Sequence, residues 1–348
     1  MFLSFIEISS ARYRHRFNFV FFKPVFYWST ISPPHLFRIN ISFTMPSWIP
    51  LLSLVAAYAP QVLASCAYGT HLHRRSDVIE APKFGYSAAN GPANWYNLDP
   101  KANDLCATGH HQSPINMADG SFELLSSSDL NIEIPDFTEG AEFENLGSTV
   151  EVVTEGLGGK LTIANTTYEL KQFHFHLPSE HLDNGTSMAM EMHMVHASED
   201  KKLAVIGIFI DLDDGAAAVT HKSKAAAREA RKRYPTILAK ESTVAATVLN
   251  SVDKIATLGK TTHTKPLKMT GLVSLLQSGS FKSYSGSLTT PPCSEGVKWL
   301  VSTEKLTIPT STYLKARSVI GYNARFPQNA PGEQNILSML ADEVDASD

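Results

Sequence analysis

The feature that most constrains the fold of this chain is a succession of short β-type segments between about residues 84 and 327. Gly, Pro, Asn and Ser residues separate the segments, and several of them alternate apolar with polar side chains, as strands do. The run AVIGIFI (204–210) is continuously apolar, which indicates a strand buried on both faces. The strands predicted most clearly are TVEVVTEG (149–156), KLTIANTTYEL (160–170), LKQFHFHLP (170–178), MAMEMHMVHAS (188–198) and KLAVIGIFIDL (202–212).

Two stretches have the composition of helices instead. Residues 216–233 are rich in alanine and basic side chains and end at Tyr234-Pro235, which predicts a solvated surface helix that stops before the proline. A second helix is predicted over residues 243–259. Residues 333–348 are predicted to form an acidic tail that frays over its last part, ADEVDASD.

Histidines are concentrated in two of the predicted strands. Because side chains alternate between the two faces of a strand, Gln172, His174 and His176 share one face, while Phe173 and Phe175 lie on the other. This segment therefore presents two imidazoles and an amide on a single face.

The strand that follows carries the pattern MEMHMVH (190–196). Its Glu191 and His193 share one face, and His196 lies on the opposite face despite its three-residue spacing from His193. If the two strands are antiparallel neighbours with their polar faces aligned, His174, His176 and His193 converge.

Three convergent imidazoles are typical of a catalytic zinc site, in which three protein ligands at about 2.0–2.1 Å leave the fourth position to water. Gln172 and Glu191 each precede a proposed ligand by two residues, and both are suited to accept the second N–H of a bound imidazole. His181 follows Pro178, beyond the strand end, and is predicted to be a supporting hydrogen-bonding group. The alternative is a set of metal-free imidazoles that are hydrogen-bonded in a core.

An apolar run near the start of the chain predicts secretion. MPSWIPLLSLVAAYAPQVLAS (45–65) has the length and the small-residue end of a signal peptide, and it is too short and too interrupted by proline to span a membrane comfortably. A hydrophobic anchor or a buried helix is the alternative. Residues 1–44 are aromatic and basic, and we interpret them as lying upstream of a true start at Met45, with a targeting extension as the alternative.

Residues 66–82 are predicted to be a propeptide or linker. They contain the dibasic pair Arg74-Arg75, a sequence of the kind that secretory processing proteases cut. Cleavage there would remove Cys66 and leave Cys106 and Cys293 as the only thiols, able to form one disulfide in an oxidising compartment.

Composition limits the classes of partner. The 348 residues are 43% hydrophobic and 18% charged, which suits a globular protein of one large domain or two small ones. A formal net charge of -4 gives no overall polybasic signal, so nucleic acid is not an expected partner. Asn165 and Asn184 begin glycosylation sequons, which have meaning only in a secreted chain.

Several separated motifs follow one another in a recognisable order, namely FGYSAANGPANW, HQSPINM, QFHFH, SEH, MEMHMVH, AVIGIF, SYSGSLTTPPCSEGVKW and NARFPQ. On these motifs the chain resembles the α-class carbonic anhydrases from about Phe84 to Gln328, and it looks like a secreted fungal member. The resemblance implies a mainly β, α+β fold: a single domain, residues 83–332, with a large twisted, mostly antiparallel central β-sheet, short peripheral helices and zinc at the bottom of a conical cleft.

The resemblance implies zinc-dependent, reversible hydration of CO₂ to bicarbonate and a proton, with His174, His176 and His193 as the zinc ligands. Zinc lowers the pKa of bound water from 15.7 to about 7, a value known for carbonic anhydrases themselves. Thr289 matches the threonine that holds the zinc-bound hydroxide, and Glu180 matches the carboxylate that accepts the threonine's proton. Since a hydroxide has one proton to give, this pair selects hydroxide and directs its lone pair at the substrate.

Further positions follow from the same resemblance. Cys106 and Cys293 match the disulfide common in extracellular members, and Gln172 and Glu191 match the partners of the zinc ligands. Sulfonamides or anions are expected to inhibit at zinc. The apolar wall at which CO₂ binds in the family is matched by Val195, Val205, Leu288 and Val297, which could equally be plain core. The polar positions of the cleft are matched by Thr290 and Tyr86.

One position departs from the fast members of the family. Ser148 falls where a histidine at the cleft mouth would pass protons to buffer, and serine has no pKa near neutrality. We therefore expect proton transfer to limit turnover, unless His110 or His263 replaces the missing histidine. The competing functions are a binding or storage module without catalysis, and a zinc hydrolase of esters, the latter expected only as a side activity.

Overall fold

The computed structural model describes residues 79–213, 240–241 and 243–345. These residues belong to one compact unit, Pro60–Asp348, as predicted for a single domain. The proposed signal peptide, the segment before it, Cys66, Arg74-Arg75 and the helix predicted over 216–233 lie outside the described residues.

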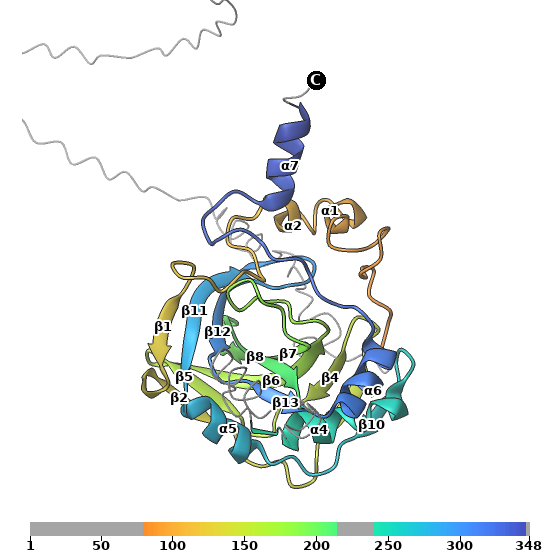
Figure 1. Ribbon diagram of the computed structural model, residues 1–348, viewed down its shortest axis with the longest axis vertical. Helices are drawn as coiled ribbons and strands as arrows, with labels where there is room; N and C mark the ends of the chain where they lie inside the picture. The colour runs from red at the N-terminus through yellow and green to blue at the C-terminus, as the bar shows by residue number, and fades with distance from the viewer. Residues whose placement is uncertain (1–78, 214–239, 242, 346–348) are drawn as a thin grey trace, which may run out of the picture. The chain divides into compact units, whose positions relative to one another are not determined.

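Strands dominate the described chain and form one curved, 13-stranded sheet (Figure 1). Its main path runs β1-β11-β12-β8-β7-β6-β4-β3-β10, and most neighbours are antiparallel, as predicted. The parallel pairs are β12 and β13 with β8, and β13 with β9. The strands are β1 (Glu123–Ser126), β2 (Leu130–Glu133), β3 (Glu142–Asn145), β4 (Val150–Val153), β5 (Lys160–Ile163), β6 (Thr166–His176), β7 (Met190–Ser198), β8 (Leu203–Leu212), β9 (Lys240–Glu241), β10 (Thr261–His263), β11 (Ser280–Ser287), β12 (Glu295–Ser302) and β13 (Leu306–Ile308).

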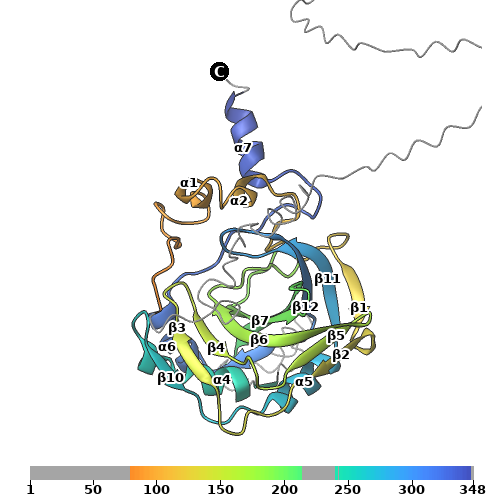
Figure 2. The same ribbon diagram turned by 180° about the vertical axis from the view of Figure 1, so that it is seen from behind.

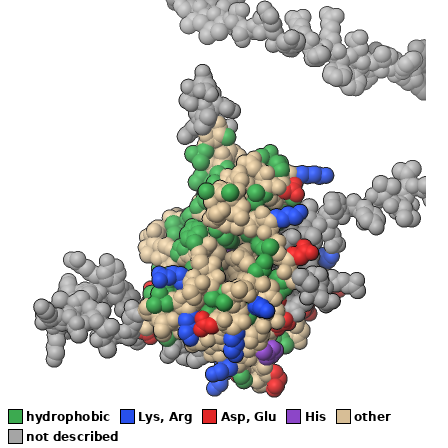
Figure 3. Space-filling model, turned by 90° about the vertical axis from the view of Figure 1, so that its right-hand side faces the viewer, with side chains coloured by type: hydrophobic (Ala, Val, Ile, Leu, Met, Phe, Trp, Pro, Cys, Tyr) green, Lys and Arg blue, Asp and Glu red, His purple; other side chains and the backbone are tan. Residues whose placement is uncertain are grey.

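The helices are short, and α4, α5 and α6 lie around the sheet, whereas α7 projects away from it (Figures 1 and 2). Within the described ranges, none is long and apolar enough to cross a membrane. On the face drawn in Figure 3, Lys and Arg side chains lie among Asp and Glu, so this face shows no extended basic surface. The helices are α1 (Trp95–Leu98), α2 (Leu105–Thr108), α4 (Thr243–Leu249), α5 (Met269–Gln277), α6 (Thr310–Ile320) and α7 (Ile336–Asp345), with 3₁₀ turns η1 (Ser127–Asp129) and η2 (Val252–Ile255).

The central strands are buried on both faces, and their alternation separates two apolar clusters. Phe173 and Phe175 belong to the larger cluster, to which α4, α5 and α6 contribute side chains. Val195 and Val205 belong to a smaller cluster around Trp299. Because His193 shares a strand face with Val195, the histidines lie on the side of the smaller cluster.

The boundaries predicted for two strands are wrong. KLTIANTTYEL is not one strand, since β5 ends at Ile163 and β6 runs unbroken from Thr166 to His176. Ala164 and Asn165 form the turn between them, with φ of +43° and +69°. Two consecutive residues of positive φ are typical of a two-residue type I′ hairpin, in which asparagine is favoured and alanine is not. Because alanine is not typical of such a turn, the turn was not predicted from the sequence.

Two further predictions also need correction. The helix predicted over 243–259 ends at Leu249, and only the 3₁₀ turn η2 follows it. Asn250 and Ser251 interrupt it, because such side chains favour turns over helix interiors. The acidic tail is not frayed over the described residues, since 336–345 form α7. The base of α7 is tied to the body by the Ser338 hydroxyl, which donates to the Ala107 carbonyl at 2.6 Å.

Candidate metal centre

The pairing of β6 with β7 brings the predicted histidines together. In the antiparallel register His174 lies directly opposite His193, and His176 lies opposite Glu191. Directly opposite side chains point to the same face of a sheet. His174, His176 and His193 are 3%, 2% and 0% exposed, and their candidate ligand atoms lie within 4.8 Å of one another. This group could hold a metal ion.

Each of the three imidazoles is oriented through one of its nitrogens. His174 Nδ1 lies 2.8 Å from Gln172 Oε1, and His193 Nε2 lies 2.9 Å from Glu191 Oε1. His176 Nδ1 lies 2.8 Å from the carbonyl oxygen of Asn323.

All three partners of these rings are acceptors, so each ring donates an N–H outward. The other nitrogen of each ring keeps its lone pair and can bind a metal ion. Alternation predicted Gln172 and Glu191 as partners of the imidazoles. Asn323 was not predicted, because it lies in a loop far away in the sequence.

Burial also keeps these imidazoles in the neutral form that binds metals. Burial holds the pKa of His174 well below its usual value and lowers that of His193. It lowers the pKa of His176 to about 4, against the opposing effect of the Asn323 hydrogen bond. At neutral pH the group therefore presents lone pairs and no protons to an incoming cation.

Glu180 lies next to this group and is fully buried. Its Oε2 is 3.5 Å from His176 Nε2 and 3.9 Å from His193 Nδ1, and its Oε1 accepts the Arg325 backbone N–H at 2.8 Å. Burial raises the pKa of Glu180 to about 7, while His193, the Arg325 N–H and a hydrogen bond with the Thr289 side chain all oppose that rise. The structure thus brings Glu180 and Thr289 into contact, as the resemblance implied.

His181 supports the group from outside it. Its Nδ1 lies 2.7 Å from Glu191 Oε1, and its Nε2 lies 2.7 Å from the Tyr284 hydroxyl. The backbone N–H groups of Glu180 and His181 both donate to Glu191 Oε2 at 2.9 Å. His181, Glu191 and His193 are also close enough to hold a metal, but their facing atoms already bond to one another. The His174–His176–His193 group is therefore the better candidate.

The apolar positions named from the resemblance lie together. Val195, Val205, Leu288 and Val297 are at most 2% exposed and belong to the cluster around Trp299. Thr290 is 5% exposed. Whether this cluster borders a conical cleft stays a prediction.

Tyr86 and Ser148, both expected at the cleft, are partly exposed. The Tyr86 ring contacts the rings of Trp95 and Tyr322 edge-on. The Ser148 carbonyl accepts from Asn323 Nδ2 at 3.1 Å, and the Asn323 carbonyl is the acceptor for His176. Ser148 is thus connected to a proposed ligand through a single residue.

The expected disulfide is present, and both sequons are accessible. Cys106 and Cys293 are joined across a sequence separation of 187 residues, and both are fully buried. Asn165 and Asn184 are exposed at turns. Their glycosylation stays a prediction.

His196 lies on the opposite face of β7 from His193, as alternation predicted, and it is fully buried. Burial lowers its pKa to about 4 from 6.5. Between these values the unfolded chain binds a proton that the folded chain does not, so stability is present above pH 6.5 and is lost as pH falls towards 4. At 1.36 kcal/mol per pKa unit, the loss approaches about 3 kcal/mol. Urea unfolding at several pH values should show this loss in wild type and a flatter profile in His196→Leu; identical profiles would contradict it.

Comparison with known proteins agrees with this geometry. The model of the eukaryotic-type carbonic anhydrase family matches residues 90–335. A carbonic anhydrase from Neisseria gonorrhoeae is 30% identical over 258 residues, covering 74% of this chain and 84% of the relative. The solved fungal α-carbonic anhydrase from Aspergillus oryzae is 36% identical with a TM-score of 0.65, covering 75% of this chain and all of that one.

A third similar structure is the α-carbonic anhydrase from Thermovibrio ammonificans in complex with the inhibitor sulfanilamide. It is 28% identical with a TM-score of 0.54, covering 74% of this chain and 99% of that chain. The family match spans well over half of the chain and includes all three histidines, Glu180 and Thr289. The chain belongs to the eukaryotic-type carbonic anhydrase family.

Proposed function

We propose that the chain hydrates CO₂ reversibly at a zinc ion held by His174, His176 and His193. The observation that carries this proposal is the orientation of the three rings. Among the described residues, neither His176 Nε2 nor His193 Nδ1 has a hydrogen-bond partner, although both atoms are buried. Buried polar atoms in proteins are nearly always satisfied, so these lone pairs are suited to a cation. Three neutral imidazoles without thiolates fit a catalytic zinc site.

Zinc bound there would supply a water of lowered pKa, and hence a hydroxide nucleophile at neutral pH, as established for carbonic anhydrases. The role of the protein is to orient that nucleophile. Because the Thr289 hydroxyl donates to the Glu180 carboxylate, its oxygen is left as an acceptor. Thr289 could then accept the one hydrogen of a hydroxide, which would leave a lone pair of that hydroxide turned towards the substrate. The Arg325 N–H favours the ionised form of Glu180 that this arrangement needs.

We propose that CO₂ occupies the apolar side of the group, formed by Val195, Val205, Leu288 and Val297, because a nonpolar gas loses no hydrogen bonds there. The backbone N–H of Thr289 would stabilise a substrate oxygen as charge develops on it. Hydrolysis of activated esters is expected as a slow side activity of the same nucleophile. Sulfonamides are expected to bind at zinc, by similarity to the sulfanilamide complex.

We further propose that the protein is secreted. The signal-peptide pattern of residues 45–65 supports this, and so does the buried Cys106–Cys293 disulfide, because disulfides persist in oxidising compartments. N-terminal sequencing of the secreted chain would test whether cleavage occurs near Ser65 or after Arg75.

The function is tested by stopped-flow CO₂ hydration with zinc content measured on the same sample. One zinc per chain, activity lost on chelation and activity restored by zinc would support it. A folded protein with one zinc per chain and no hydration activity would instead favour the binding or storage module. The alternative of metal-free core histidines predicts no zinc retention.

Turnover is expected to depend on buffer because Ser148 cannot store a proton. Raising the buffer concentration at constant pH and ionic strength should raise kcat and leave kcat/KM unchanged. Ser148→His should raise kcat at low buffer by about 10²-fold, the lower end of the usual effect of a positioned acid–base group. Ser148→Ala is the matched control, and a kcat independent of buffer in the wild type would contradict the prediction.

A further inference from the structure

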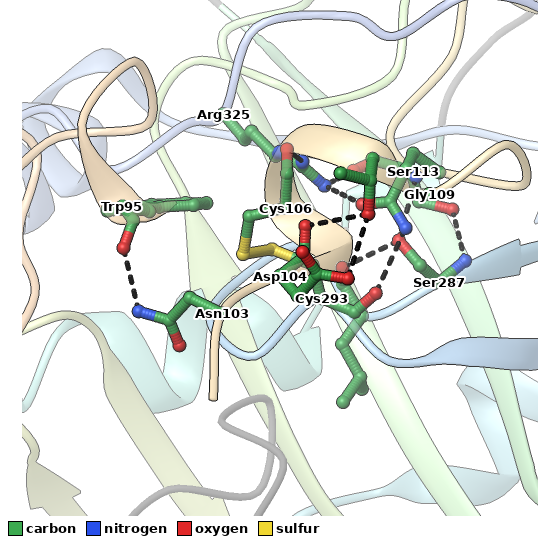
Figure 4. Close-up of a disulfide and its surroundings, with 12 residues drawn as sticks. Trp95, Asn103, Asp104, Cys106, Gly109, Ser113, Ser287, Cys293 and Arg325 are labelled. Atoms are coloured by element: carbon green, nitrogen blue, oxygen red, sulfur yellow. Dashed lines mark hydrogen bonds between the residues drawn. A yellow bond between two sulfur atoms is a disulfide. The ribbon is translucent and has the colours of Figure 1, made fainter. Parts of the chain in front are cut away.

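Arg325 is 1% exposed, and its side chain is one of the largest fully buried side chains in the described residues. Its Nη1 donates to Gln112 Oε1 at 2.9 Å and to the Ser113 carbonyl at 2.8 Å, and its Nη2 donates to the Cys106 carbonyl at 3.1 Å (Figure 4). The guanidinium carbon also lies 5.7 Å from the centroid of the Trp95 ring. Burying a cation is costly unless it is well bonded, so this side chain fixes the segments that it joins.

The backbone of Arg325 connects the buried guanidinium to the candidate metal centre. Its N–H donates to Glu180 Oε1 at 2.8 Å. Two residues earlier, the Asn323 carbonyl accepts from His176, and Asn323 Oδ1 accepts the Leu177 N–H at 2.7 Å. The loop from 323 to 325 therefore positions Glu180 and one proposed ligand, and the guanidinium fixes its far end.

Hydrogen bonds also link the guanidinium to the segment that carries Thr289. Gln112, which accepts from Arg325, donates through Nε2 to the Cys293 carbonyl at 3.0 Å. The Cys293 N–H donates to the Thr290 carbonyl at 2.9 Å, and Cys293 is joined to Cys106 by the disulfide. Glu180 and the segment that carries Thr289 are thus both attached to one cluster made of Arg325, Gln112 and the disulfide.

We propose that Arg325 is a positioning residue for the Thr289–Glu180 pair. Its guanidinium joins the 323–325 loop to the disulfide and so fixes the relative position of the two side chains. The proposal rests on the proposed function, because the relative position of Thr289 and Glu180 affects binding only if a ligand binds beside them. The effect on binding is selectivity. A correctly held Thr289 accepts a hydrogen and favours ligands that have one to donate, whereas a displaced Thr289 loses this preference.

The test compares two ligands on the zinc-loaded protein by isothermal titration calorimetry. Sulfanilamide keeps a hydrogen on its sulfonamide nitrogen, and thiocyanate has none to donate. In Arg325→Met the Kd for sulfanilamide should rise about tenfold relative to that for thiocyanate, the lower end of the usual effect of losing an orienting partner. Partial unfolding or zinc loss lowers the number of sites but leaves the ratio of the two Kd values unchanged.

Arg317→Met is the matched control, because Arg317 is exposed and its guanidinium carbon lies 5.6 Å from the Tyr313 ring centroid, away from this cluster. Gln112→Met, which removes one acceptor of Arg325 and the donor to Cys293, carries the test if Arg325→Met does not accumulate. It should move the ratio in the same direction. An unchanged ratio in the folded variant overturns the proposal. Wild-type protein that holds zinc but neither hydrates CO₂ nor binds sulfanilamide overturns the proposed function instead.

Discussion

His193→Ala is expected to lose its zinc and at least about a thousandfold of its kcat/KM for CO₂ hydration, because a metal ion contributes several kcal/mol to such a transition state. The truncation removes a donor nitrogen that faces the other two imidazoles. It leaves Glu191 bonded to His181 and to two backbone N–H groups, so the buried carboxylate keeps partners. The chain should therefore still fold.

Zinc content, circular dichroism and stopped-flow hydration on one preparation decide this prediction. His196→Leu is the matched control, since it alters a buried histidine of the same strand on the opposite face. It should keep both zinc and activity at pH 7.5. A folded His193→Ala protein that still hydrates CO₂ at the wild-type rate would remove the proposed ligand role.

Thr289→Val should lower kcat/KM about 10²–10³-fold with zinc retained, the usual cost of losing one hydrogen-bonding group aimed at a transition state. The substitution keeps the shape of the side chain but removes the hydroxyl that contacts Glu180. The nucleophile can then rotate, and fewer encounters with CO₂ have a lone pair in line. The buried Glu180 also loses a donor.

Thr289→Ser keeps the hydroxyl and should recover most of the activity. The two variants have to be compared at equal zinc occupancy, because this separates loss of orientation from loss of metal. Equal kcat/KM in Thr289→Val and wild type would contradict the role of the hydroxyl, whatever the zinc content.

The sheet was largely predictable, and the turns were not. Alternation over 172–177 and 190–196 assigned the correct face to Phe173, His174 and His196, because strand geometry is set by the local backbone. The hairpin at Ala164-Asn165 was missed, since alanine is an uncommon residue at positive φ. Helix α7 was missed because its acidic end resembles a disordered tail.

The sequence by itself determined the three imidazoles, their two partners Gln172 and Glu191, and, by resemblance, the family. These depend on spacings within one hairpin-like pair of strands, where a period of two fixes which side chains meet. Only the tertiary structure decided how Asn323, Tyr284 and Arg325 act, because each reaches the centre from a segment more than 100 residues away. A contact across so long a separation depends on how the whole sheet closes, and no local pattern encodes it.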